Sequence, residues 1–183
     1  FRGFCGLIPI LFLIPKERFL DFYKTDRPFL HLKRCLAGLI ALISIFVALR
    51  NLPLATVVSI TFAAPIFTTI FSIFLLNEKV RLYRWLAVFV GFLGVIIISE
   101  PGLTSLNIYY LYPIIFCLGL SYVAIAIRKL STTEPVWLIG FFFSFSIMIL
   151  SFLTFYQGWK MPSLIDLSLL SMIGVLGGLA NLW

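Results

Sequence analysis

One apolar stretch of the sequence carries a row of small polar side chains around a proline. The row has the spacing i, i+4, i+7 and i+11, which places its members on one helical face: Thr61, Pro65, Thr68 and Ser72. Proline has no backbone N–H, so Pro65 frees the carbonyl of Thr61. In a membrane such a carbonyl must be buried in protein or line a wet cavity. The row therefore predicts substrate-binding residues, with packing between helices as the alternative.

Arg2 is a second candidate for substrate binding. It lies one or two turns from the outer end of a first helix, if that helix ends at Pro15 and spans about 20 residues. An arginine at that depth should face protein or water, where it can hold a carboxylate or a phosphate. The alternative is that its side chain extends to the outer headgroups.

Other chemistries lack the residues that they need. The predicted spans have no Asp, Glu, Lys or His near their centres, and the chain has neither a GxxxxGK nor a GxSxG motif. The three cysteines fall in or at the ends of apolar runs and are expected to be small buried hydrophobes: Cys5, Cys35 and Cys117. His31 has no Cys or His neighbour. We therefore predict no catalytic residue, no cofactor and no metal.

The elements that carry these residues are apolar helices. Hydrophobic residues make up 62% of the chain and charged residues 11%, against roughly 45–50% and 25% in soluble domains. About 20 apolar residues span a bilayer core, and residues 51–77 carry no charge. The sequence predicts an all-α polytopic membrane protein with helices over 1–14, 35–50, 53–76, 83–99, 108–127, 136–156 and 166–183. The first and last helices look cut, so we expect a fragment of a longer protein.

The short helices predict where three arginine side chains lie, and the glycines predict where helices pack closely. The helices over 35–50 and 83–99 are short for the bilayer. Their flanking arginines, Arg34, Arg50 and Arg84, should therefore extend toward the interface, with local thinning of the bilayer or burial among neighbours. Glycines in two helices suit close helix contact: Gly91, Gly94, Gly174, Gly177 and Gly178. A second break is expected in the helix over 108–127, at Pro113 and Gly119 with Ser121.

The basic residues lie on alternate loops. Ten of the 14 Lys and Arg fall between the first and second, third and fourth, and fifth and sixth predicted helices, and Arg84 in the first turn of the fourth helix is an eleventh on the same side. The positive-inside rule places these loops in the cytoplasm. The net charge of +7 is thus a signal of topology, and we predict no nucleic-acid partner. Glu78 should sit at the cytoplasmic end of its helix, paired with Lys79, Arg81 or Arg84 and away from substrate.

Several segments together resemble the EamA-type branch of the drug/metabolite transporter superfamily. The segments are Phe1-Arg2, the run 48–56, Ala64-Pro65-Ile66-Phe67, and Leu76-Asn77-Glu78-Lys79 followed by Arg84-Trp85 and the run 91–95. The resemblance implies a fragment of a ten-helix transporter with two inverted five-helix repeats and a cavity between them. Residues 1–102 would be the first repeat without its first helix, and 103–183 the start of the second. Within the family, the runs 27–34 and 55–59 look like the S-adenosylmethionine uptake carriers of intracellular bacteria.

The expected function is secondary transport of a small polar or amphipathic metabolite by alternating access, with S-adenosylmethionine uptake as the cargo that the resemblance implies. The alternative is a non-transporting membrane scaffold or assembly protein; a membrane-embedded enzyme would want intramembrane His or paired carboxylates. The expected partners are a small-molecule substrate and the lipid bilayer of a bacterial inner membrane. The sequence leaves a homodimer open.

Overall fold

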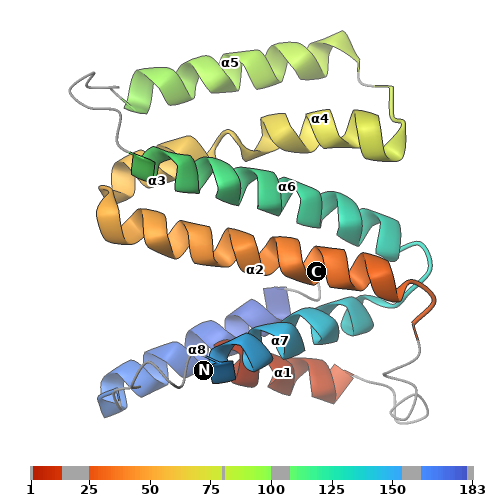
Figure 1. Ribbon diagram of the computed structural model, residues 1–183, viewed down its shortest axis with the longest axis vertical. Coiled ribbons are helices and arrows are strands. Elements are labelled where there is room, and N and C mark those ends of the chain that lie inside the picture. Colours follow the sequence, from red (N-terminus) through yellow and green to blue (C-terminus); the bar gives the residue numbers. More distant parts are fainter. Residues whose placement is uncertain (1, 14–24, 80, 100–107, 154–161, 181–183) are drawn as a thin grey trace. The chain divides into compact units, whose positions relative to one another are not determined.

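The computed structural model describes residues 2–13, 25–79, 81–99, 108–153 and 162–180, and every regular element in these ranges is helical (Figure 1). Most of the helices end within a few residues of the predicted boundaries. In chain order they are α1 (Arg2–Leu13), α2 (Pro28–Asn51), α3 (Leu54–Thr61), α4 (Ala64–Leu76), α5 (Leu82–Ser99), the 3-10 turn η2 (Ile108–Tyr110), α6 (Leu111–Leu130), α7 (Val136–Leu153) and α8 (Leu164–Ala180).

Three stretches of the described chain are long and apolar enough to cross a membrane: Pro28–Asn51, Leu54–Leu76 and Ile108–Leu130. Shorter apolar helices accompany them, so the predicted class of all-helical polytopic membrane protein is confirmed. The ten-helix architecture with two inverted repeats, and the repeat boundary at residue 102, stay predictions.

Helix α2 begins seven residues before the predicted start at 35. Pro28 is its first residue, where the missing N–H and the fixed φ of proline suit a helix. Its 24 residues extend about 36 Å, enough for a bilayer core of about 30 Å. Arg34 is buried among its neighbours, one of the predicted ways to place this arginine, with only 1% of the residue exposed.

The chain divides into two compact units, one formed by Phe1–Cys35 with Lys129–Trp183 and the other by Leu36–Arg128. In the first unit α1 packs against α7 and α8 through glycines. A Cβ on Gly3 would lie 2.7 Å from the backbone nitrogen of Met148, and one on Gly178 would overlap the backbone of Gly6. Gly174 and Gly178 are both buried, so the glycines of α8 make the predicted close contact.

In the second unit, the helices around the predicted polar row are α3, α4, α5 and α6. A Cβ on Gly119 would lie 2.9 Å from the carbonyl oxygen of Ala37 and from the side chain of Ala41, so α6 approaches α2 closely. The predicted break in this helix is absent, because α6 is continuous through Pro113. Helix α5 lies against α3 and α4. Within the described ranges, added Cβ atoms at Gly91 and Gly94 meet nothing within 4 Å, so the close contact predicted for these two glycines is not found in this part of the chain.

Candidate functional site

The predicted apolar helix around Pro65 is broken in two. Helix α3 ends at Thr61, and α4 begins at Ala64 with Pro65 in its first turn. The carbonyls of Ile60 and Thr61 lie 3.5 and 3.8 Å from the Sγ of Cys117, which donates weakly to both. The carbonyl of Ile60 also accepts from the N–H of Ala63 at 3.0 Å, whereas Pro65 cannot donate to that of Thr61. A side chain of α6 therefore contacts the carbonyl that the proline leaves free, as a break inside a membrane requires.

Two hydroxyl groups hold the start of α4 against α6. The Ser121 hydroxyl donates to the carbonyl of Ala64 at 2.8 Å, and the Thr68 hydroxyl lies 2.9 Å from the same oxygen and 3.0 Å from the Ser121 Oγ. Ser121 is fully buried. The surrounding core consists of Ala63, Ala64 and Cys117 with Ile66, Phe67 and Phe116 packed on it.

A cavity of about 720 Å³ lies along the broken helix in this unit. Residues of α4, α5 and α6 form most of its wall: Phe62, Ala64, Pro65, Ile66, Thr68, Thr69, Ser72, Glu78, Ala87, Val88, Gly91, Phe92, Leu120, Ala124, Ile125 and Arg128. A smaller apolar cavity of about 320 Å³ lies between α4 and α5, with Phe67, Trp85 and Phe89 among its walls. The large cavity thus combines apolar walls with few polar groups, the usual make-up of a small-molecule site.

The structure brings together three of the four residues of the predicted row. Pro65, Thr68 and Ser72 line the large cavity, whereas Thr61 does not. The Thr61 hydroxyl instead donates to the carbonyl of Val58 at 2.7 Å. The predicted row assumed one continuous helix with the spacing i, i+4, i+7 and i+11. The break between Thr61 and Ala64 separates Thr61 from the other three residues.

A charged pair closes one end of the cavity wall. The guanidinium of Arg128 donates to both carboxylate oxygens of Glu78, at 2.8 and 3.1 Å. Asn77 ends α4 in the left-handed conformation, and the backbone N–H groups of Asn77 and Glu78 both donate to the carbonyl of Ser72. This cap orients Glu78. Its partner in the described chain is Arg128 and not the predicted Lys79 or Arg81, while the side chain of Arg84 lies outside the described residues. Glu78 also lines the cavity, which the prediction of a place away from the substrate did not anticipate. An ion pair this exposed contributes about 0–1 kcal/mol to stability.

Sequence reasoning missed three residues of α6 that take part in this site. Cys117 and Ser121 are i and i+4 on the face of α6 that meets the break, and Arg128 lies about two turns further toward its end. The Cys117 and Ser121 spacing was readable from the sequence. Their partners lie more than 50 positions away, and nothing local pairs them.

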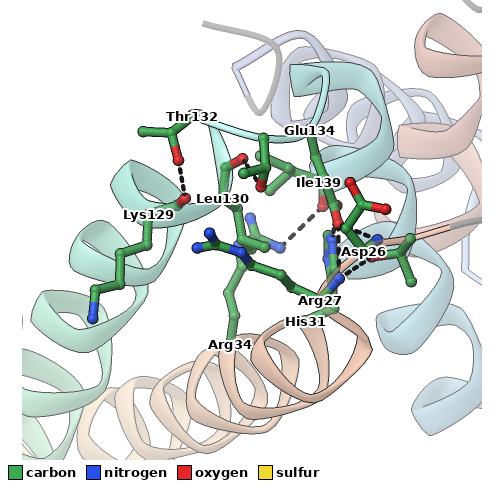
Figure 2. A network of polar contacts seen from close by, with 11 residues as sticks. Asp26, Arg27, His31, Arg34, Lys129, Leu130, Thr132, Glu134 and Ile139 are labelled. Atoms are coloured by element: carbon green, nitrogen blue, oxygen red, sulfur yellow. Dashed lines mark hydrogen bonds and ion pairs between the residues drawn. The ribbon is translucent and has the colours of Figure 1, made fainter.

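A buried polar cluster in the first unit links the segment before α2 to the loop before α7 (Figure 2). The Glu134 carboxylate accepts hydrogen bonds from the Thr25 hydroxyl, from the His31 ring and from the backbone N–H groups of Asp26 and Arg27. Burial raises the pKa of Glu134, but the hydrogen bonds from Thr25 and His31 and the charge of His31 outweigh it, so the net pKa is lowered.

Arg34 belongs to the same cluster. Its guanidinium donates to the carbonyl of Ile139 at 3.1 Å and lies over the ring of Phe143, 4.8 Å from the centroid. The Nδ1 of His31 and the Nε of Arg34 are buried without a hydrogen-bond partner in the described part of the chain. The cluster ties two inter-helix segments that are about 100 positions apart.

The structure describes the predicted cysteines fully but Arg2 only in its backbone. The backbone of Arg2 opens α1, but its side chain lies outside the described residues, so its role stays a prediction. All three cysteines are buried and unpaired, as predicted. Within the described ranges, no group of three His, Cys, Asp or Glu residues could hold a metal ion.

The apolar helices and the broken helix beside a cavity define a multi-pass α-helical membrane protein. The EamA-like transporter family matches residues 2–100, and the chain belongs to that family. No solved structure shows a significant match.

Several curated relatives are named as transporters. The chain is 30% identical over 154 residues to an S-adenosylmethionine uptake transporter of Rickettsia prowazekii, a match that covers 84% of the chain and 52% of the relative. It is 28% identical over 106 residues to a riboflavin transporter of Vibrio cholerae, covering 58% and 36%. A pseudopaline exporter of Pseudomonas aeruginosa is 25% identical over 186 residues, covering 100% and 64%. The chain spans about half the length of the curated Rickettsia relatives that it matches.

Proposed function

We propose that the chain forms part of a secondary transporter that moves a small polar or amphipathic metabolite across the bacterial inner membrane by alternating access. The observation that carries the proposal is the 720 Å³ cavity beside an apolar helix that is broken at Pro65. Broken helices that line a cavity are a recurring feature of secondary transporters. The family and the transporter names of its relatives support the same class.

S-adenosylmethionine is the proposed cargo, and uptake is the proposed direction. Both come from the names of the Rickettsia relatives, which are about 30% identical to this chain. The riboflavin and pseudopaline relatives differ in cargo, and the latter in direction, at lower identity. The proposed pathway runs along Pro65, Thr68 and Ser72, with Thr61 and Arg2 as further substrate-binding residues.

The test fills the cavity with a large side chain and measures membrane insertion beside uptake. Thr68→Trp places a large ring in the cavity wall, so it should abolish uptake of labelled S-adenosylmethionine by the full-length protein at normal membrane insertion. Phe74→Trp is the matched control, because Phe74 lies on the same helix with 76% of its surface exposed. Normal uptake by Thr68→Trp would remove the pathway from this cavity. A wild-type protein that moves no small molecule would favour the alternative of a non-transporting membrane scaffold.

A further inference from the structure

The large cavity has one charged end, and that end holds one charge of each sign. Glu78 and Arg128 are the charged residues among the described residues of its wall, and their side chains meet in the two hydrogen bonds given above. The rest of the wall consists of apolar side chains and the hydroxyls of Thr68, Thr69 and Ser72. A ligand in this cavity therefore meets a carboxylate and a guanidinium side by side.

We propose that Glu78 and Arg128 bind the head group of a zwitterionic, amino-acid-like metabolite, with the ligand carboxylate on Arg128 and its ammonium on Glu78. This inference rests on the proposed transport function and names the substrate class of the same cavity. The ligand replaces one internal ion pair by two ion pairs of its own. The planar guanidinium can bind a carboxylate through two parallel hydrogen bonds, as it now binds Glu78.

The exposure of the pair makes this exchange feasible. The side chain of Arg128 is 61% exposed and that of Glu78 is 31% exposed. Water already screens the two charges, so separating them costs little. The carboxylate does not have to move far, because the left-handed cap at Asn77 holds its backbone at the end of α4.

The hydroxyl groups of the wall indicate what the rest of the ligand should carry. The Thr69 hydroxyl donates to the carbonyl of Pro65 at 2.9 Å, and the Ser72 hydroxyl donates to that of Thr69 at 2.8 Å. Their protons are committed to the backbone, so their oxygens are left as acceptors. Amino and hydroxyl donors on the ligand suit this wall, and the rings of Phe62 and Phe92 suit an apolar or aromatic part.

The experiment follows uptake of two labelled probes by the full-length protein: S-adenosylmethionine, which has an amino-acid head group, and riboflavin, which has none. We expect uptake of the first, and an increase in its KM of at least about tenfold in both Glu78→Gln and Arg128→Gln. Lys79→Gln is the control, since Lys79 is the exposed neighbour of Glu78 and does not line the cavity. The control should leave KM unchanged.

Competition separates ligand binding from a structural role of the pair. Decarboxylated S-adenosylmethionine lacks the group assigned to Arg128, so Arg128→Gln should leave its inhibition constant unchanged while weakening the intact compound. Uptake of S-adenosylmethionine with unchanged KM in both variants, or uptake of riboflavin alone, would overturn the zwitterion proposal and leave transport standing. Uptake of neither probe by the wild-type protein would overturn both.

Discussion

Replacing Glu134 by glutamine tests whether the buried polar cluster stabilises the protein. One carboxylate oxygen accepts from the Thr25 hydroxyl and from two backbone N–H groups, and the other faces the Nε2 of His31. In Glu134→Gln the amide oxygen can keep the first set. The amide nitrogen then faces His31, so two donors meet where a donor and an acceptor met before.

The His31 imidazole cannot relieve this conflict without a cost in free energy. Changing its tautomer would move the proton to Nδ1, which is buried without a partner in the described chain. Either arrangement leaves a buried donor unsatisfied, which costs about 1–3 kcal/mol. If the imidazole is charged in the wild type, the variant breaks a buried ion pair, and the cost rises toward about 3–5 kcal/mol.

Unfolding of the full-length protein in mixed micelles measures this cost. Glu78→Gln is the matched control: it is the same substitution in an exposed pair, with an expected loss of about 0–1 kcal/mol. The lowered pKa of Glu134 adds a pH signature. Its stabilisation is fully present above the ordinary carboxyl pKa of 4.5 and is lost as the pH falls through the lowered pKa, so the two proteins should converge in acid. A loss in Glu134→Gln no larger than in Glu78→Gln would refute the reasoning.

Three further experiments test other parts of the structure. Gly178→Leu should lower the free energy of unfolding by about 1–3 kcal/mol or more, because the backbone of α1 fills the space of its Cβ. Gly94→Leu is the control and should be tolerated, because the added Cβ meets open space among the described residues. Equal losses of stability in the two variants would contradict this packing. Single cysteines at Lys79 and Gly158 test the predicted orientation: an impermeant thiol reagent added outside should label 158 and spare 79, and the reverse would invert the topology. Arg2→Gln should weaken uptake of S-adenosylmethionine with insertion intact, and unchanged uptake would remove Arg2 from the site.

The apolar helices and the break at Pro65 were predictable because both depend on local physics. A long uncharged run has few options in water, and proline removes a helical hydrogen bond wherever it sits. The start of α2 was not predicted, because the Lys, Arg and His residues over 27–34 have the composition of a loop. In the structure His31 and Arg34 are buried, where His31 contacts Glu134 in the loop before α7 and Arg34 contacts Ile139 in α7, and no local pattern indicates these distant partners.

The part of the candidate site that lies on α4 was predictable from the sequence, and the part on α6 was not. The spacing of Pro65, Thr68 and Ser72 depends on one helix, so the sequence was sufficient to group them. Glu78 had three basic neighbours in the chain, and proximity in sequence favoured them. Its partner Arg128 is 50 positions away and was selected by the packing of α6 beside α4, which no local pattern encodes.

The distance along the chain between the members of the buried cluster sets an order of events during synthesis. Glu134 follows His31 by 103 positions, and Ile139 follows Arg34 by 105. At about 5–20 residues per second, ribosomes make the partner of His31 about 5–20 s after the imidazole itself. For that interval the first turns of α2 hold a cation and an imidazole with no internal partner, so they must stay at the water interface until α7 arrives. The nascent protein is therefore most exposed to quality control in this window, and variants of Glu134 should prolong it.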